Sequence, residues 1–323
     1  MTVRIIQINK INKGERIDKF IVEILENVTR GQIIKMIKTS EITVNNKSVK
    51  PSYILKGDEK VQIDKIKGKN NKIIPNKSID LDVIENNDNF IIINKQLGLQ
   101  IHPSHIERKN TLVNVLLVKF PEILNVGEDK ERPGIVHRID KDTTGLLVVA
   151  KNQDTFKDLK KIFKNRLVQK TYYALVFGLF KQKEGIIDAP IAKAMSYTKQ
   201  KIAFGKYKGS SKEAKTEFKV VKEFILSNEL SISLVELKPK TGRTHQIRVH
   251  MAHLGHPLVG DKRYYTKNEY KLNLNNFRKY DLNTFFLHAK KLSFELDNKK
   301  YNFEVEYPKR FNNLLEYLDK FKK

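Results

Sequence analysis

The chain has 323 residues, 40% of them hydrophobic, which is enough for a sizeable core and for two domains. It carries 62 Lys and Arg against 37 Asp and Glu, a net charge of +25, which predicts nucleic acid as a partner ahead of a membrane surface. The absence of cysteine excludes disulfides, thiolate zinc sites and cysteine nucleophiles. No apolar run approaches the ~20 residues that span a bilayer, and no signal segment opens the chain, so we expect a cytoplasmic protein without membrane contact.

Two short helices and a hairpin are predicted near the N-terminus. Residues 15–28 place their apolar side chains on one face, and a capping box from Thr29 to Gln32 opens a second helix. The segment ITVNNKSVK then predicts a hairpin with its Asn-Asn pair at the tip. Residues 14–66 are therefore expected to form a small α/β module. The lysines of the second helix expected to bind RNA are Lys35 and Lys38.

A linker and a larger domain are predicted to follow. Residues 67–80 are rich in Lys and Asn and indicate a linker, although a surface loop within one domain is the alternative. Residues 81–323 combine many short strand patterns with a few helical ones, which predicts an α+β domain built on a mixed, mostly antiparallel sheet with inserted helices. The expected strands are 88–95, 145–151, 170–178, 214–224 and 230–239, and the expected helices are 110–120, 154–167 and 244–255.

A polar cluster lies directly before one buried-looking strand. In GIVHRIDKDTTGLLVVAKN, residues 134–152, His137, Arg138 and Asp140 come just ahead of the apolar run. Charges beside a core strand carry a desolvation cost, so they need a partner or a function. A rigid loop between buried strands suits a preorganised catalytic group. A carboxylate in such a turn can also serve as a turn cap, so the residues alone leave both roles open.

A second polar segment, KPKTGRTHQIRVHMAHLGHPLVGD, holds two of the chain's 12 arginines and four histidines. Because lysine is the usual cation here, the arginines Arg243 and Arg248 indicate a planar, two-pronged contact with phosphates or with a carboxylate. Thr244 is the expected helix cap. The histidines lack the spacing and acidic partner of a metal motif, so we expect no metal.

A third segment, QKTYYALV, places two tyrosines side by side on a predicted strand. Tyr172 and Tyr173 point to opposite faces, so one of them is expected to face a groove. Ordinary packing with the hydroxyl at the surface is the alternative for either side chain.

The three segments together resemble the RluA family of pseudouridine synthases. They occur in family order and with family-like spacing across most of residues 81–307. The upstream IINKQLGLQIHP is similar to a further family motif, with Gln96 in place of the usual proline, and Ile139 stands where leucine is usual. The segments are most similar to the large-subunit synthase D branch, ahead of the C and A branches. The N-terminal module resembles an S4-type RNA-binding domain.

The resemblance implies isomerisation of uridine to pseudouridine in large-subunit (23S) ribosomal RNA, on a flipped-out base and without cofactor or metal. It puts the essential aspartate at Asp140, its ion-pair partner at Arg248, and a tyrosine that stacks on the base and assists proton removal from C5 at Tyr172. Arg138 would fill the space left by the base or pair with a phosphate. The other residues of this domain expected to contact RNA are His137, Arg243 and His245.

Other functions remain open at this stage. A non-catalytic RNA-binding or ribosome-assembly factor could keep the same fold, but the presence of Asp140, Tyr172 and Arg248 favours an enzyme. A synthase C-like or tRNA-directed enzyme would keep the chemistry and change the substrate. A metal-dependent nuclease needs clustered carboxylates, which the sequence does not display. The modified uridines are left open, as is the choice between free RNA and an assembling subunit. We expect a monomer.

Overall fold

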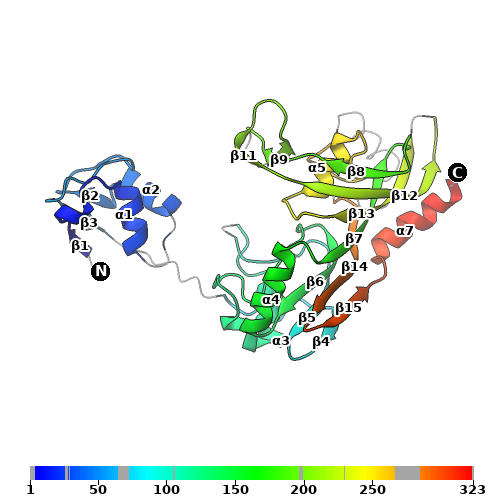
Figure 1. Ribbon diagram of the computed structural model, residues 1–323, viewed down its shortest axis with the longest axis horizontal. Coiled ribbons are helices and arrows are strands. Elements are labelled where there is room, and N and C mark those ends of the chain that lie inside the picture. The colour runs from blue at the N-terminus through cyan, green and yellow to red at the C-terminus, as the bar shows by residue number, and fades with distance from the viewer. Residues whose placement is uncertain are drawn as a thin grey trace. The chain divides into compact units, whose positions relative to one another are not determined.

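The computed structural model describes residues 4–25, 28, 30–64, 73–104, 106–195, 199–228, 230–265 and 284–321. The chain divides into two compact units, Met1–Lys72 and Ile73–Lys323 (Figure 1). This division differs from the predicted boundaries, because a strand precedes residue 14 and because Ile73 already packs into the core of the larger unit. The predicted cap Thr29 and most of the N-terminal half of the predicted linker lie outside the described residues.

The N-terminal unit packs two helices against a small antiparallel sheet. Its described elements are β1 (Arg4–Gln7), α1 (Ile17–Ile24), α2 (Arg30–Lys38), β2 (Ile42–Val44) and β3 (Lys60–Ile63). The strand order is β1-β3-β2, and the apolar faces of both helices close the core over the sheet. The predicted hairpin tip is confirmed: Asn45 and Asn46 have φ of 48° and 60°, as a two-residue type I′ turn requires.

One buried carboxylate joins the two helices of this unit. Asp18, in the first turn of α1, has a side chain with no exposed surface. It accepts hydrogen bonds from the guanidinium groups of Arg16 and of Arg30, which opens α2. The Arg16 hydrogen bond in particular holds the pKa of Asp18 at about 2, below its usual value of 3.8. The helix pair is therefore tied together by charge as well as by its apolar core.

The larger unit is built on one twisted sheet. Its strands are β4 (Val83–Asn86), β5 (Phe90–Lys95), β6 (Thr144–Ala150), β7 (Gln169–Phe177), β8 (Glu184–Asp188), β12 (Lys215–Ile225), β13 (Ser231–Pro239), β14 (Leu287–Leu296) and β15 (Lys299–Glu304). Within the described residues the order is β4-β5-β6-β14-β7-β13-β12-β8, with β15 paired to β14. Neighbours run antiparallel except for the parallel pair β6 and β14, as the mixed-sheet prediction requires.

Helices and a second small sheet surround this framework (Figure 1). The helices are α3 (Leu112–Lys119), α4 (Gln153–Lys164), α5 (Gln246–His253) and α7 (Lys309–Leu318), and the small sheet has β9 (Ile191–Lys193), β10 (Gln200–Ile202) and β11 (Lys208–Lys212). Residues of α3 and α4 join the core on one face of the large sheet, whereas α7 packs into the core on the other. No helix in the described ranges is long and apolar enough to cross a bilayer.

Two predicted helix ends are wrong. The helix expected over 154–167 ends at Lys164, because Arg166 turns into a left-handed conformation with φ of 61° and leaves Leu167 64% exposed. The helix expected to be capped by Thr244 begins instead after His245, whose backbone is left-handed with φ of 56°. Neither left-handed residue is a glycine, so the usual sequence signal for this conformation is missing at both positions.

Candidate active site

Asp140 lies in the turn that leads into β6. The backbone N–H of Thr143 donates to the carbonyl oxygen of Asp140 at 3.1 Å and closes this turn. Gly145 follows with φ of 107°, and a Cβ there would lie 2.2 Å from the carbonyl oxygen of Ala289 in β14. Only glycine allows β6 and β14 to approach this closely. Gly145 therefore fixes the position of the Asp140 turn relative to the sheet.

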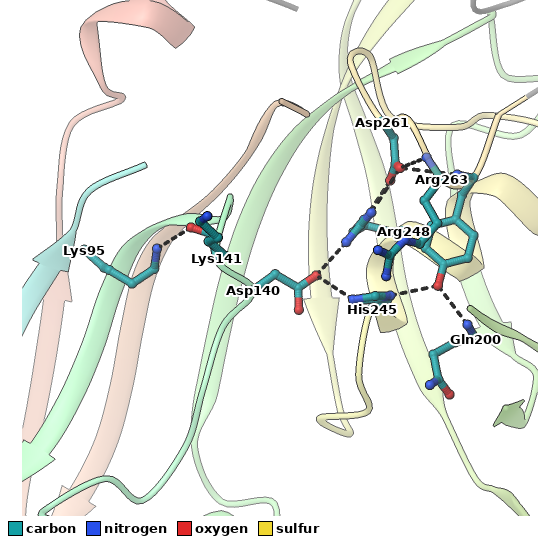
Figure 2. Close-up of polar contacts among 9 residues, drawn as sticks. Lys95, Asp140, Lys141, Gln200, His245, Arg248, Asp261 and Arg263 are labelled. Atoms are coloured by element: carbon teal, nitrogen blue, oxygen red, sulfur yellow. Dashed lines mark hydrogen bonds and ion pairs between the residues drawn. The ribbon is translucent and has the colours of Figure 1, made fainter. Parts of the chain in front are cut away.

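A fully buried lysine at the end of β5 supports the same turn. The ammonium group of Lys95, 1% exposed, donates to the carbonyl oxygens of Gln96 at 2.9 Å, Leu99 at 3.0 Å and Lys141 at 2.9 Å. Figure 2 shows the bond that reaches the turn beside Asp140. Burial lowers the pKa of Lys95 to about 7, and nearby carboxylates oppose that shift. Three acceptors need all three N–H donors of an ammonium group, so the geometry favours the charged form.

Arg248, on α5, lies between two carboxylates. Its Nη1 donates to Oδ2 of Asp140 at 3.0 Å, while its Nε and Nη2 donate to Asp261 at 2.7 and 3.0 Å (Figure 2). Arg248 is 7% exposed and Asp261 is 1% exposed, and the guanidinium packs 4.2 Å from the ring centre of Phe285. Burial lowers the pKa of Arg248, but the bonds and charges of the two carboxylates outweigh it and raise the pKa overall. A permanent cation is therefore held against Asp140.

Tyr172, on β7, faces the same region from the sheet. It is 8% exposed, and burial together with the charge of Asp140 raises the pKa of its hydroxyl, which keeps the phenol neutral. Tyr173 packs on the opposite face of the sheet and donates to Glu236 at 2.7 Å. The two tyrosines do point to opposite faces, and Tyr172 is the one beside Asp140.

These residues line a cleft of about 630 Å³. Its volume lies in the range of ligand sites, roughly 300–1,000 Å³. Among the described residues that line it, Asp140 is the only carboxylate, and the cleft is otherwise strongly cationic. The lining cations are Arg138, Lys160, Lys164, Arg166, Lys170, Lys240, Arg243 and Arg248. Such a cleft favours an anionic ligand and presents it with a single carboxylate.

His137 and Arg138 occupy different positions in this cleft. The His137 Nε2 accepts a hydrogen bond from the backbone N–H of Val148 at 3.1 Å, and its ring stacks on Phe163 at 4.4 Å. Burial lowers the pKa of His137 to about 3, so the ring is a neutral part of the cleft wall. Arg138 is exposed and lines the cleft, where its guanidinium can meet a ligand.

The segment before α5 contributes two more of the predicted residues. Arg243 lines the cleft, and its Nε donates to the carbonyl oxygen of Glu213 at 2.9 Å. His245 lies deeper, with Nε2 3.8 Å from Oδ2 of Asp140 and Nδ1 2.8 Å from the hydroxyl of Tyr264. Sequence reasoning missed both Tyr264 and Asp261, although a charge directly after the apolar PLVG repeats the pattern that drew attention to Asp140.

Two predicted RNA-contacting lysines belong to the other unit, and two histidines on or just after α5 are not among the described residues that line the cleft. Lys35 and Lys38 are exposed on α2 of the N-terminal unit. His250 and His256 are engaged elsewhere in the core, His250 with Thr216 and Ala189 and His256 with Phe177. No group of three or more His, Asp or Glu that could hold a metal ion occurs in the described part of the chain.

The family model for RNA pseudouridylate synthase matches residues 89–253, which include Asp140, Tyr172 and Arg248. This chain belongs to the RNA pseudouridine synthase family. A second model, the S4 domain, matches residues 15–61 of the N-terminal unit. The resemblance drawn from the three segments is thus confirmed at the family level, and so is the enzyme class.

The sequence similarity between this pseudouridine synthase and its relatives extends over nearly the whole chain. Ribosomal large subunit pseudouridine synthase C of Buchnera aphidicola is 35% identical over 301 residues, 91% of this chain and 90% of the relative. Ribosomal large subunit pseudouridine synthase D of Blochmanniella floridana is 34% identical over 299 residues, 91% and 84% of the two chains. The solved human RNA pseudouridylate synthase domain containing 1 is 25% identical with a TM-score of 0.57, covering 76% of this chain and 97% of the human one. The predicted fold class is confirmed.

Proposed function

We propose that this pseudouridine synthase isomerises specific uridines of large-subunit ribosomal RNA in the cytoplasm, with Asp140 as the reacting group. The observation that carries the proposal is Asp140, the one carboxylate among the described residues of the cleft, paired with Arg248 and surrounded there by eight described cationic side chains. The cations suit a polyanion, and the carboxylate suits chemistry on a sugar or base rather than phosphate binding. The names of the synthase C and D relatives support ribosomal RNA as the substrate.

The reaction needs one reactive carboxylate and no electron transfer. The N1–C1′ bond of uridine breaks, a C5–C1′ bond forms, the C5 proton is lost, and N1 gains a proton, so the product is an isomer. In one route an Asp140 oxygen bonds to C1′ as the uracil anion leaves, and C5 later displaces it. In the other, Asp140 takes the C2′ proton as uracil leaves and returns it after C5 adds. Both routes require an ionised Asp140, which Arg248 stabilises.

Tyr172 and the cleft cations have supporting roles in this proposal. A buried, neutral phenol next to Asp140 suits stacking on the uracil ring, and its raised pKa makes it a weak source of phenolate. The base must be flipped out of its stack to reach Asp140. Arg138 lines the cleft, which supports a role in filling the gap or binding a phosphate. Lys35 and Lys38 of the S4 domain add phosphate contacts from the other unit.

The test is mapping of pseudouridine by carbodiimide-induced reverse-transcription stops. Wild-type, Asp140→Ala and Asp140→Asn proteins are incubated with large-subunit rRNA transcript, immature large subunits and tRNA. We expect stops at a few rRNA uridines with the wild type alone, because only the wild type has an ionisable group at this position. RNA affinity should stay within about 3-fold, since one carboxylate contributes little among many cationic contacts.

Each other outcome contradicts a specific part of the proposal. Stops on tRNA alone would show that the substrate is tRNA and not ribosomal RNA. Stops produced by the Asp140→Ala protein would show that Asp140 is not required for the reaction. Tight binding without stops on any of the RNAs would leave an RNA-binding factor that keeps the fold.

A further inference from the structure

A short chain of polar contacts reaches Asp140 from the small sheet. The backbone N–H of Gln200, the first residue of β10, donates to the hydroxyl of Tyr264 at 2.9 Å. That hydroxyl lies 2.8 Å from Nδ1 of His245. Nε2 of the same ring lies 3.8 Å from Oδ2 of Asp140 (Figure 2). The Tyr264 ring also lies 5.1 Å from the guanidinium carbon of Arg248. Tyr264 therefore contacts both residues that approach Oδ2 of Asp140.

These contacts favour one tautomer of His245. The Tyr264 oxygen accepts from the Gln200 N–H, and its single proton has Nδ1 of His245 within hydrogen-bond distance as an acceptor. A neutral imidazole that accepts at Nδ1 carries its proton on Nε2, where it faces the carboxylate. The opposite tautomer would aim a lone pair at Asp140 and leave the Tyr264 proton without an acceptor among the described residues. Burial lowers the pKa of His245, and the charge of Asp140 only partly opposes this shift. The lowered pKa keeps the ring neutral.

We propose that His245 and Tyr264 form a positioning pair that determines which oxygen of Asp140 reacts. Arg248 and His245 both point at Oδ2, at 3.0 and 3.8 Å, and in Figure 2 the other oxygen, Oδ1, points away from them. The Arg248 hydrogen bond and the nearby Nε2 of His245 both favour this orientation of the carboxylate, so Oδ1 is the oxygen presented to the ribose. The 3.8 Å contact is longer than a hydrogen bond, and contacts of this kind tighten in substrate complexes. The inference rests on the proposed role of Asp140.

The tautomer can be measured without any substrate. In ¹⁵N-histidine NMR spectra of the full chain, we expect the His245 ring of the wild type to carry its proton on Nε2. Tyr264→Phe removes the donor to Nδ1, so the ring should shift toward a mixture of the two tautomers. Tyr173→Phe is the matched control, because it deletes another tyrosine hydrogen bond on the opposite face of the sheet and should leave the His245 signals unchanged. A proton on Nδ1 in the wild type would overturn the inference.

Turnover of two His245 variants separates positioning from backbone conformation. The left-handed backbone at His245 suits Asn better than Gln, so His245→Asn should fold at least as well. The longer Gln side chain can place its amide nitrogen near the position of Nε2, whereas Asn cannot reach it. We expect kcat to fall about 10-fold for His245→Gln and Tyr264→Phe and about 100-fold for His245→Asn, with a smaller loss of RNA affinity in the two His245 variants.

Two kinetic results would contradict the proposed role of His245 and Tyr264. Asn performing as well as Gln would mean that only the backbone turn matters. A Tyr264→Phe protein with wild-type turnover would mean that the tautomer is irrelevant. If the wild type modified no RNA, the proposed function would fail, and the NMR measurement would still decide whether His245 and Tyr264 are paired as inferred.

Discussion

The two carboxylates that hold Arg248 should respond differently to the loss of their charge. Asp261→Asn replaces a buried carboxylate with a neutral amide, so the Arg248 guanidinium keeps a single carboxylate partner. Breaking a buried ion pair in this way lowers the free energy of unfolding by roughly 3–5 kcal/mol. Asp140 has a side chain that is 19% exposed in the cleft, and Arg248 keeps Asp261 when it is removed. Asp140→Asn should therefore abolish turnover and change stability by about 1 kcal/mol or less.

Denaturant unfolding of the two variants and the wild type measures this difference. Equal losses of stability would show that Asp140 is also a structural partner of Arg248. Retained turnover in Asp140→Asn would show that its charge is not required.

Lys95 should affect both stability and turnover, although it does not line the cleft. Lys95→Met leaves the carbonyl oxygens of Gln96, Leu99 and Lys141 without their donor. Each unsatisfied group costs roughly 1–3 kcal/mol, offset in part by removing a buried charge, so we expect a net loss of about 2–4 kcal/mol. Turnover should fall more than RNA affinity, because the turn that carries Asp140 loses an anchor.

The matched control is Lys141→Met. It changes an exposed side chain of the same turn and keeps the carbonyl that accepts from Lys95, so its stability should match the wild type. Thermal unfolding and single-turnover assays of both variants give the comparison. A stable, fully active Lys95→Met protein would contradict the anchoring role.

The sequence predicts which residues matter better than what each of them contacts. The placement of Asp140, Arg248 and Tyr172 around one cleft agrees with the resemblance. The contact of His245 with Tyr264 could not be predicted, because it depends on a left-handed turn without glycine and on a loop with no periodic pattern.

The pairing of helices α1 and α2 should depend on pH through Asp18. The folded-state pKa of Asp18 is about 2, below the usual 3.8, so folding favours the ionised form. The contribution of Asp18 to stability is thus fully present above about pH 4 and is lost as the pH falls toward 2. Asp18→Asn should lower the stability of this helix pair at neutral pH and weaken its response to acid between pH 4 and 2. The measurement is the loss of native amide NMR signals of α1 in the full chain as the pH is lowered from 7 to 2, compared between the wild type and Asp18→Asn.

The signals of the second unit are the internal reference for that titration. If α1 lost its native signals at the same pH in wild type and Asp18→Asn, other carboxylates would control the acid response. The arginines are 41% and 50% exposed, so added salt should reduce the difference between the two proteins.

Strands were predictable where several apolar residues follow one another along the chain. Strand β7 buries its side chains in both cores of the larger unit, and its apolar run predicted bounds close to those observed. The strands β8, β9, β10 and β11 were not predicted, because they are short and their exposed residues follow no apolar alternation. The hairpin β14–β15 was also missed, although its sequence holds a usable signal, a turn at Asp297 and Asn298 with φ of 51° and 59° between alternating strands.

For the whole molecule, the distribution of charge sets what the N-terminal unit contributes. Residues 1–72 hold 16 Lys and Arg against 8 Asp and Glu, so most of the +25 belongs to residues 73–323, with 46 against 29. The larger unit also has its own apolar cores on both faces of the sheet. It should therefore fold and bind RNA by itself, while the S4 domain adds affinity and selects sites.

Deleting residues 1–72 tests this division of labour. Each lost phosphate contact lowers the slope of log affinity against log salt by about 0.7–0.9, so a truncated protein should bind more weakly and with a shallower slope. Because the described residues that line the Asp140 cleft all belong to residues 73–323, the truncated protein should retain residual pseudouridine formation at high enzyme concentration. The double variant Lys35→Ala/Lys38→Ala in the full chain measures the contribution of α2 alone. It should lower the slope of log affinity against log salt by about 1–2. A truncated protein that modifies intact rRNA at the wild-type rate and with an unchanged slope would show that the catalytic unit alone carries recognition.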